Sequence, residues 1–166
     1  MGIVLNKESS LEREWTTLNV AGMPARLIGP ASVITAYKPS SYSGEYQYSV
    51  AFDVEALEPL SALEVRFLTF DVWGDKGRSL SMTMVEDFPV GKKNLHGAWR
   101  VFSENEAEEY YASVAYIARV RTKSGRVAVA DPDAVVREVK KFSDKFTAAD
   151  LAPQPTAVPT PAPTKE

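Results

Sequence analysis

Residues 63–85, LEVRFLTFDVWGDKGRSLSMTMV, hold two runs of alternating apolar and polar residues around the turn sequence GDKG at 74–77. Residues 110–130, YYASVAYIARVRTKSGRVAVA, repeat this arrangement around TKSG at 122–125. Alternating strands joined by glycine-containing turns are typical of antiparallel folds made of two packed sheets. The two cassettes therefore predict a mainly β protein, an Ig-like antiparallel β-sandwich of about seven strands.

The patterns of two predicted strands support this fold class. Residues 45–57 place six apolar or aromatic side chains on one face, which predicts a strand with one buried side. In residues 63–73 the apolar set shifts by one position, from Val65 and Phe67 to Leu68 and Phe70. Such a shift predicts either a β-bulge or a strand that is covered on both faces.

The chain divides into three parts. Residues 1–30 are predicted to be an N-terminal extension, in which the spacing of Leu11, Trp15 and Leu18 favours one or two helical turns. Residues 31–150 form the predicted sandwich, and they end with a helix over 132–146 that Asp131 caps. Residues 151–166 are rich in Pro, Ala and Thr, and this composition predicts a disordered tail.

Composition excludes several classes of protein. The 166 residues include no cysteine, so disulfides and thiolate chemistry are absent. The net charge of −3 makes non-specific electrostatic binding of nucleic acid unexpected. No apolar run is as long as a membrane span. If Met1 is the native start, the protein is expected in the cytoplasm; if Met1 replaced a removed leader, it is expected to be periplasmic or secreted.

Three segments carry a resemblance to a known family. They are VRFLTFDVWGDKG at 65–77, FPVG at 88–91 and YIARVRTKSGRV at 116–127. Together they resemble bacterial Ig-like accessory domains of the FxLYD type, over about residues 46–130. The resemblance implies an interaction or accessory role, with no catalytic residue to carry over.

Several residues have side chains that could act in catalysis or bind a metal, but none of them predicts an active site. His96 is the only histidine and falls in a predicted loop without a neighbouring nucleophile. The carboxylates are better explained as solvated strand faces, turn residues or helix caps than as a hydrolase pair or a calcium site. Those considered are Asp53 and Glu55, Asp71 and Asp75, the acidic residues at 104–109, and Asp131 and Asp133. We therefore predict no catalytic residue, no metal ligand and no cofactor.

Exposed aromatic residues are the better candidates for a binding surface, since Tyr and Trp combine apolar area with a polar group. Trp73 stands beside the first turn, and Tyr42 lies in a serine-rich loop. We predict these two residues as ligand-binding.

The leading hypothesis is a non-enzymatic interaction or accessory module, of bacterial origin, with another protein as its partner. One alternative is a module that binds a carbohydrate or another small molecule through Trp73 and Tyr42. A second alternative is a hydrolase with paired carboxylates. Open sheet edges would also allow self-association by strand addition, although the sequence does not set the oligomeric state.

Overall fold

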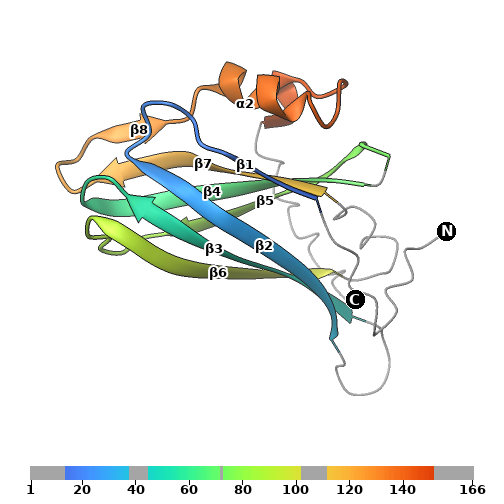
Figure 1. Ribbon diagram of the computed structural model, residues 1–166, viewed down its shortest axis with the longest axis horizontal. Coiled ribbons are helices and arrows are strands. Elements are labelled where there is room, and N and C mark those ends of the chain that lie inside the picture. The colour runs from blue at the N-terminus through green and yellow to red at the C-terminus, as the bar shows by residue number, and fades with distance from the viewer. Residues whose placement is uncertain (1–13, 38–44, 72, 102–111, 152–166) are drawn as a thin grey trace, which may run out of the picture.

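In the residues that the structure describes, the protein is mainly β, with two sheets and one α-helix (Figure 1). The computed structural model describes residues 14–37, 45–71, 73–101 and 112–151. Sheet A contains β1 (Glu14–Leu18), β4 (Leu60–Phe70), β5 (Lys76–Met84), β7 (Ala112–Thr122) and β8 (Val127–Val129). Sheet B contains β2 (Ala25–Tyr37), β3 (Glu45–Ala56) and β6 (Gly91–Val101). The helix α2 (Pro132–Val139) and the 3-10 helix η1 (Ala148–Leu151) end the described chain.

The strand order is β1-β7-β4-β5 in sheet A, with β8 also paired to β7, and β2-β3-β6 in sheet B. All pairs are antiparallel except β1 with β7, which is parallel. The two sheets lie face to face, and α2 covers the side of sheet A that faces away from sheet B (Figure 1). We call this side the outer face of sheet A.

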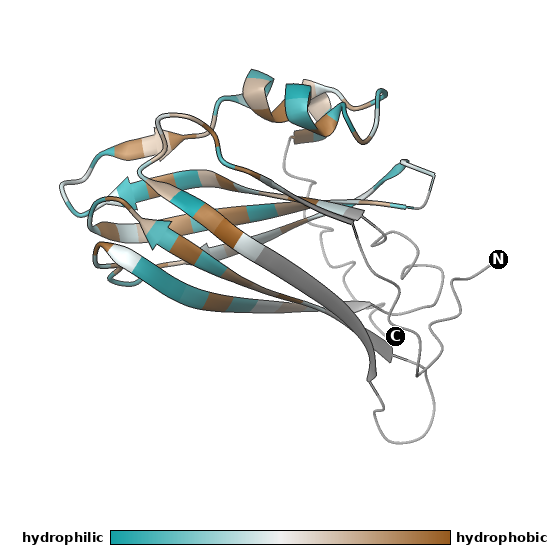
Figure 2. Cartoon of the chain, in the orientation of Figure 1, coloured by the Kyte–Doolittle hydropathy of each residue, from teal (hydrophilic) through white to brown (hydrophobic). Residues whose placement is uncertain are grey.

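One layer of the core lies between the sheets. It follows from the alternation of hydrophobic and hydrophilic residues along the strands, which Figure 2 shows by colour. On β3 the side chains of Val50, Phe52 and Val54 are buried, as the sequence predicted. Phe67 of β4 meets them from the other sheet, with its ring centroid 5.6 Å from that of Phe52 and 5.4 Å from that of Trp99. Aromatic rings at these separations interact favourably with one another, in addition to the stabilisation from the apolar area that they bury.

The apolar shift in β4 reflects coverage on both faces. Phe67 faces sheet B, whereas Phe70 points to the outer face and contacts Phe142 and Phe146, at centroid distances of 6.2 Å and 6.1 Å. Both Phe70 and Leu68 are fully buried. The chain after α2 therefore covers the outer face of β4, whose apolar residues the sequence pattern predicted to be buried.

A β-bulge lies in β7 and sets which residues reach the outer face. Val65 pairs with Ile117 while Glu64 pairs with Arg119, so Ala118 is an extra residue in β7. The extra residue shifts the alternation of β7 by one position. As a result Tyr116 and Arg119 share the outer face, rather than lying on opposite faces as strict alternation predicted.

The N-terminal and C-terminal predictions need correction. Residues 14–18 form a strand rather than helical turns, because they pair with β7 along its edge. β2 also begins inside the predicted 1–30 extension, at Ala25. The helix ends at Val139 instead of residue 146, and several of the following backbone bonds span three residues, as from Phe142 N–H to the Val139 carbonyl. The apolar spacing beyond Val139 thus reports packing of Phe142 and Phe146 on Phe70, not a longer helix.

Replacing Phe146 by alanine should lower the free energy of unfolding by about 3–5 kcal/mol, because the ring is buried against Phe70. Chemical denaturation followed by circular dichroism measures this change. Leu57→Ala is the matched control, since Leu57 is exposed and should change stability by less than about 0.5 kcal/mol. Equal effects of the two substitutions would contradict the docking of the C-terminal segment.

Candidate functional site: a groove on the outer face of sheet A

The outer face of sheet A presents two rows of side chains beside β8. The register of the strands sets Val129, Arg119, Glu64 and Thr83 opposite one another across β8, β7, β4 and β5. The next row sets Val127, Arg121 and Ala62 opposite one another. Directly opposed residues of neighbouring strands lie within side-chain contact, so each row forms a continuous strip.

Glu64 is the centre of this surface. Its side chain is only 5% exposed, and Arg66 Nε donates to its Oε1 at 2.8 Å. Arg119 Nε donates to the other oxygen, Oε2. A second nitrogen of Arg66, Nη1, donates to the carbonyl of Leu151 at 3.1 Å, which ties the charge cluster to η1.

The electrostatics of the cluster follow from burial and pairing. Burial favours the neutral form of Glu64, but hydrogen bonds from Arg66 and Arg119 outweigh it and hold the pKa of Glu64 below its ordinary value. Burial raises the pKa of Tyr116, which lies opposite Arg66, so its phenol stays protonated. The cluster is therefore one anion between two permanent cations.

Two hollows adjoin the cluster. One has a volume of about 220 Å³, and the other, of about 270 Å³, extends beneath α2. Arg119 lines both hollows, so we call them together the arginine groove. The first is lined by Ala62, Leu63, Glu64, Thr83, Arg119, Val120, Arg121 and Val127, and the second by Arg66, Tyr116, Ala118, Arg119, Val129, Ala130, Pro132, Val135 and Leu151.

The groove combines an apolar lining with excess positive charge. Arg66, Arg119 and Arg121 line it against a single carboxylate, that of Glu64. The Arg119 side chain is 62% exposed although its Nε is held by Glu64. Its Nη groups make no hydrogen bond with the part of the chain that the structure describes. A guanidinium fixed at one nitrogen and open at the others is suited to binding a carboxylate.

The predicted residue Trp73 lies elsewhere, at the tip of the β4–β5 hairpin, and is 84% exposed. The turn is well fixed: Asp71 Oδ1 accepts from the N–H groups of Trp73 and Asp75, both at 2.8 Å. Lys145 Nζ also bonds Asp75 at 3.0 Å, which joins the tip to the C-terminal segment. Trp73 is thus an exposed indole on a rigid support.

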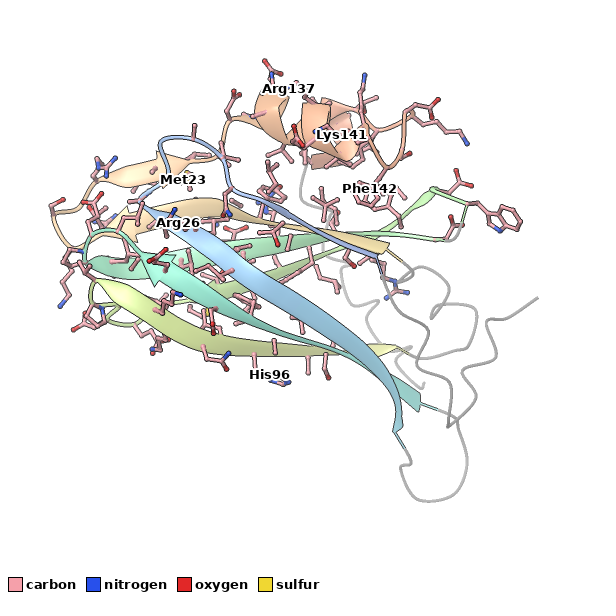
Figure 3. All side chains as sticks on the ribbon, in the orientation of Figure 1. Met23, Arg26, His96, Arg137, Lys141 and Phe142 are labelled. Carbon is pink, nitrogen blue, oxygen red and sulfur yellow. The ribbon has the colours of Figure 1, made fainter. Side chains whose placement is uncertain are left out.

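The other predicted candidates do not converge. His96 lies in β6 rather than in a loop, and its side chain points away from the core (Figure 3). Its placement in the strand follows from the pairing of residues 91–101 with β3, which overrides the local sequence KKNLHG. Asp53 accepts from Asn94, and Glu55 pairs with Arg26 at 2.6 Å. Asp131 caps α2 by accepting from Asp133 N–H, as predicted.

Tyr42 and the acidic residues at 104–109 lie outside the described residues. Within residues that are described, no group of three His, Asp or Glu side chains is arranged to hold a metal ion. No helix in those same ranges is long and apolar enough to cross a membrane.

The sequence candidates did not include the groove residues Glu64, Arg66, Arg119 and Arg121. Their spacing did carry a signal, since Glu64 and Arg66 stand two apart in one strand, as do Arg119 and Arg121 in the other. Such spacing puts each pair on one face. The bulge at Ala118 that sets them opposite one another was not readable from the alternation.

Comparisons with known proteins add little. No family model matches the chain, and no curated protein matches it. Among solved structures, the chain is similar to the X-ray structure of the Northeast Structural Genomics Consortium target SoR45. The similarity has a TM-score of 0.42 and 11% identity, and covers 65% of this chain and 83% of that one.

Glu64→Gln should lower the free energy of unfolding by about 1–3 kcal/mol near neutral pH, because it removes the anion between two arginines. The folded pKa of Glu64 lies below the ordinary value of 4.5, so its contribution is complete above about pH 4.5. That contribution is lost as the pH falls through the folded pKa.

Urea denaturation at neutral and acidic pH tests this prediction. The wild type should lose more stability than Glu64→Gln as the solution is acidified below about pH 4.5. Glu138→Gln is the matched control, because its partner Lys141 is exposed and the change should stay within about 0.5 kcal/mol. Parallel pH profiles for wild type and Glu64→Gln would be evidence against the paired, ionised Glu64.

Proposed function

We propose that this chain is a non-enzymatic binding module, and that the arginine groove binds an extended acidic segment of another protein. The observation that carries the proposal is Arg119, which Glu64 holds at one nitrogen while most of its side chain remains exposed between two hollows. A carboxylate of the partner would bond to Arg119 or Arg121, and neighbouring apolar side chains would pack on Val127 and Val129.

The shape and charge of the groove favour an extended segment. Val127 and Val129 are exposed although both belong to a strand, which leaves an apolar strip next to the arginines. Apolar strips rimmed by charge are typical of recognition surfaces. A segment that alternates acidic and apolar residues would match the alternation of arginine and valine across β7 and β8.

The strand order supports the same class of protein, for which we propose an Ig-like fold. On this proposal β2, β3 and β6 would correspond to strands A, B and E of an immunoglobulin domain, and β4, β7 and β8 to strands C, F and G. On this assignment β5 lies beside strand C, and β1 is an added strand. The fold is used by many binding modules, but the proposed role rests on the groove rather than on this likeness.

Selection from a display library of random linear peptides, with the full chain immobilised, tests the proposal. The enriched peptides should contain Asp or Glu interspersed with apolar residues. Arg121→Gln should weaken their binding about tenfold or more, as expected for a charged hydrogen bond, and Arg119→Gln should act in the same direction. Added salt should weaken binding as well.

Arg137→Gln is the matched control, because Arg137 is an exposed arginine on the outer side of α2 (Figure 3). It should leave peptide affinity unchanged. Enrichment of peptides without acidic residues, or equal affinity for wild type and Arg121→Gln, would overturn the proposal.

The exposed indole of Trp73 favours a second candidate, a module that binds carbohydrate. An exposed aromatic ring on a hydrogen-bonded turn offers an apolar platform, and Asp71 and Asp75 belong to the same turn. In this case the groove would not be the binding surface.

Tryptophan fluorescence during titration with a panel of oligosaccharides tests carbohydrate binding through Trp73. Binding should shift the emission of the wild type, and Trp73→Phe should abolish both the shift and the affinity. The partly buried Trp99 remains as an internal reference. An absence of any shift across the panel would remove carbohydrate binding through Trp73.

A further inference from the structure

β5 forms one border of sheet A. Within the described ranges it pairs only with β4, so the other side of its backbone has no strand partner there. Its start carries Lys76, Arg78 and a register shift against β4 between Lys76 and Ser79, but the strand contains no proline and its stretch from Ser79 to Met84 contains no charged residue. Native proteins usually protect a border strand with charges, prolines or bulges, because an open border is a template for another strand.

The side chains of β5 are also incompletely covered. Leu80, Met82 and Met84 pack on the core but are only partly buried, as is Trp99 of the neighbouring border strand β6. The two borders already lie close together: a Cβ on Gly97 would stand 2.8 Å from Met82 Sδ and 2.9 Å from Trp99 Cη2. A second strand laid along the open side of β5 would extend the packing on Met82 and Met84.

The charges at the ends of β5 indicate what could pair with it. Lys76 and Arg78 stand at its start, and Glu86 and Asp87 follow its end. Glu86 pairs with Lys93 at 2.7 Å and Asp87 with Lys123 at 2.9 Å, yet their side chains are still 44% and 75% exposed. If a second β5 ran antiparallel, its basic start would lie against the acidic end of the first.

We propose that two copies of this chain pair through their β5 borders, antiparallel and centred near Ser81. In this register Lys76 of one copy lies opposite Glu86 of the other, at both ends of the interface. The pairing satisfies backbone groups along both borders and covers the part-buried methionines. Sheet A of each copy becomes half of one continuous sheet.

The dimer also fixes the direction of the two outer faces. The two-fold axis of an antiparallel border pairing stands perpendicular to the sheet, so both outer faces point to the same side. Both arginine grooves then open in one direction. A partner with two binding segments could reach both.

Analytical ultracentrifugation of the full chain over a range of concentrations is the first test. The wild type should sediment as a reversible monomer–dimer system. Ser81→Lys sets two lysines against each other at the centre and should weaken the dimer about tenfold or more. Ser124→Lys, in the exposed β7–β8 turn, should leave the dimer unchanged.

A charge exchange keeps the proposal testable should Ser81→Lys fold poorly, which circular dichroism would reveal. The double variants K76E/R78E and E86K/D87K should each dimerise more weakly than the wild type. When mixed, they should form a heterodimer that native mass spectrometry detects. A wild type that stays monomeric at all concentrations, a dimer that Ser81→Lys does not weaken, or a mixture without heterodimer would overturn the proposal.

Discussion

The structure depends on the burial of β4 on both of its faces. Phe67 and its neighbours build the layer between the sheets, and Phe70 packs against Phe142 and Phe146 of the segment that follows α2. A strand covered on one side only could have a polar outer face along its whole length. Because β4 does not, the C-terminal segment acts as part of the core, and the turn at Gly74 is fixed by the same segment through Lys145 and Asp75.

At the polar end of β4 the C-terminal segment covers the outer face less completely, and the groove forms there. Glu64 and Arg66 interrupt the apolar outer face, and α2 does not extend over them far enough to exclude solvent from Arg119. A buried carboxylate without partners would be destabilising by several kcal/mol. Two arginines prevent this, and one of them, Arg119, then presents its remaining nitrogens at the surface. Stability and binding potential here come from the same ion pair.

Much of the layered fold was predictable from local sequence. Alternation placed Val50, Phe52 and Val54 in the core, glycine-containing turns marked both hairpins, and Asp131 with Pro132 marked the start of α2. These features depend on neighbouring residues, which the sequence displays directly. Three features depend on distant contacts instead: β1 and the inclusion of His96 in β6 on strand pairing, and the end of α2 on packing against Phe70.

The groove belongs to the second kind. Whether Arg119 lies with Tyr116 or on the opposite face depends on a single extra residue, Ala118, and that residue is defined only by the register with β4. Ala118 looks like any other small strand residue in the sequence. By contrast, the exposure of Trp73 follows from its place beside a tight turn and was readable. Side chains that act alone can be placed from sequence, whereas a site assembled across strands requires the register. The same reasoning applies to the border strand β5. Its uncharged stretch points to pairing with another strand only once the sheet order shows β4 on one side of it and no described strand on the other.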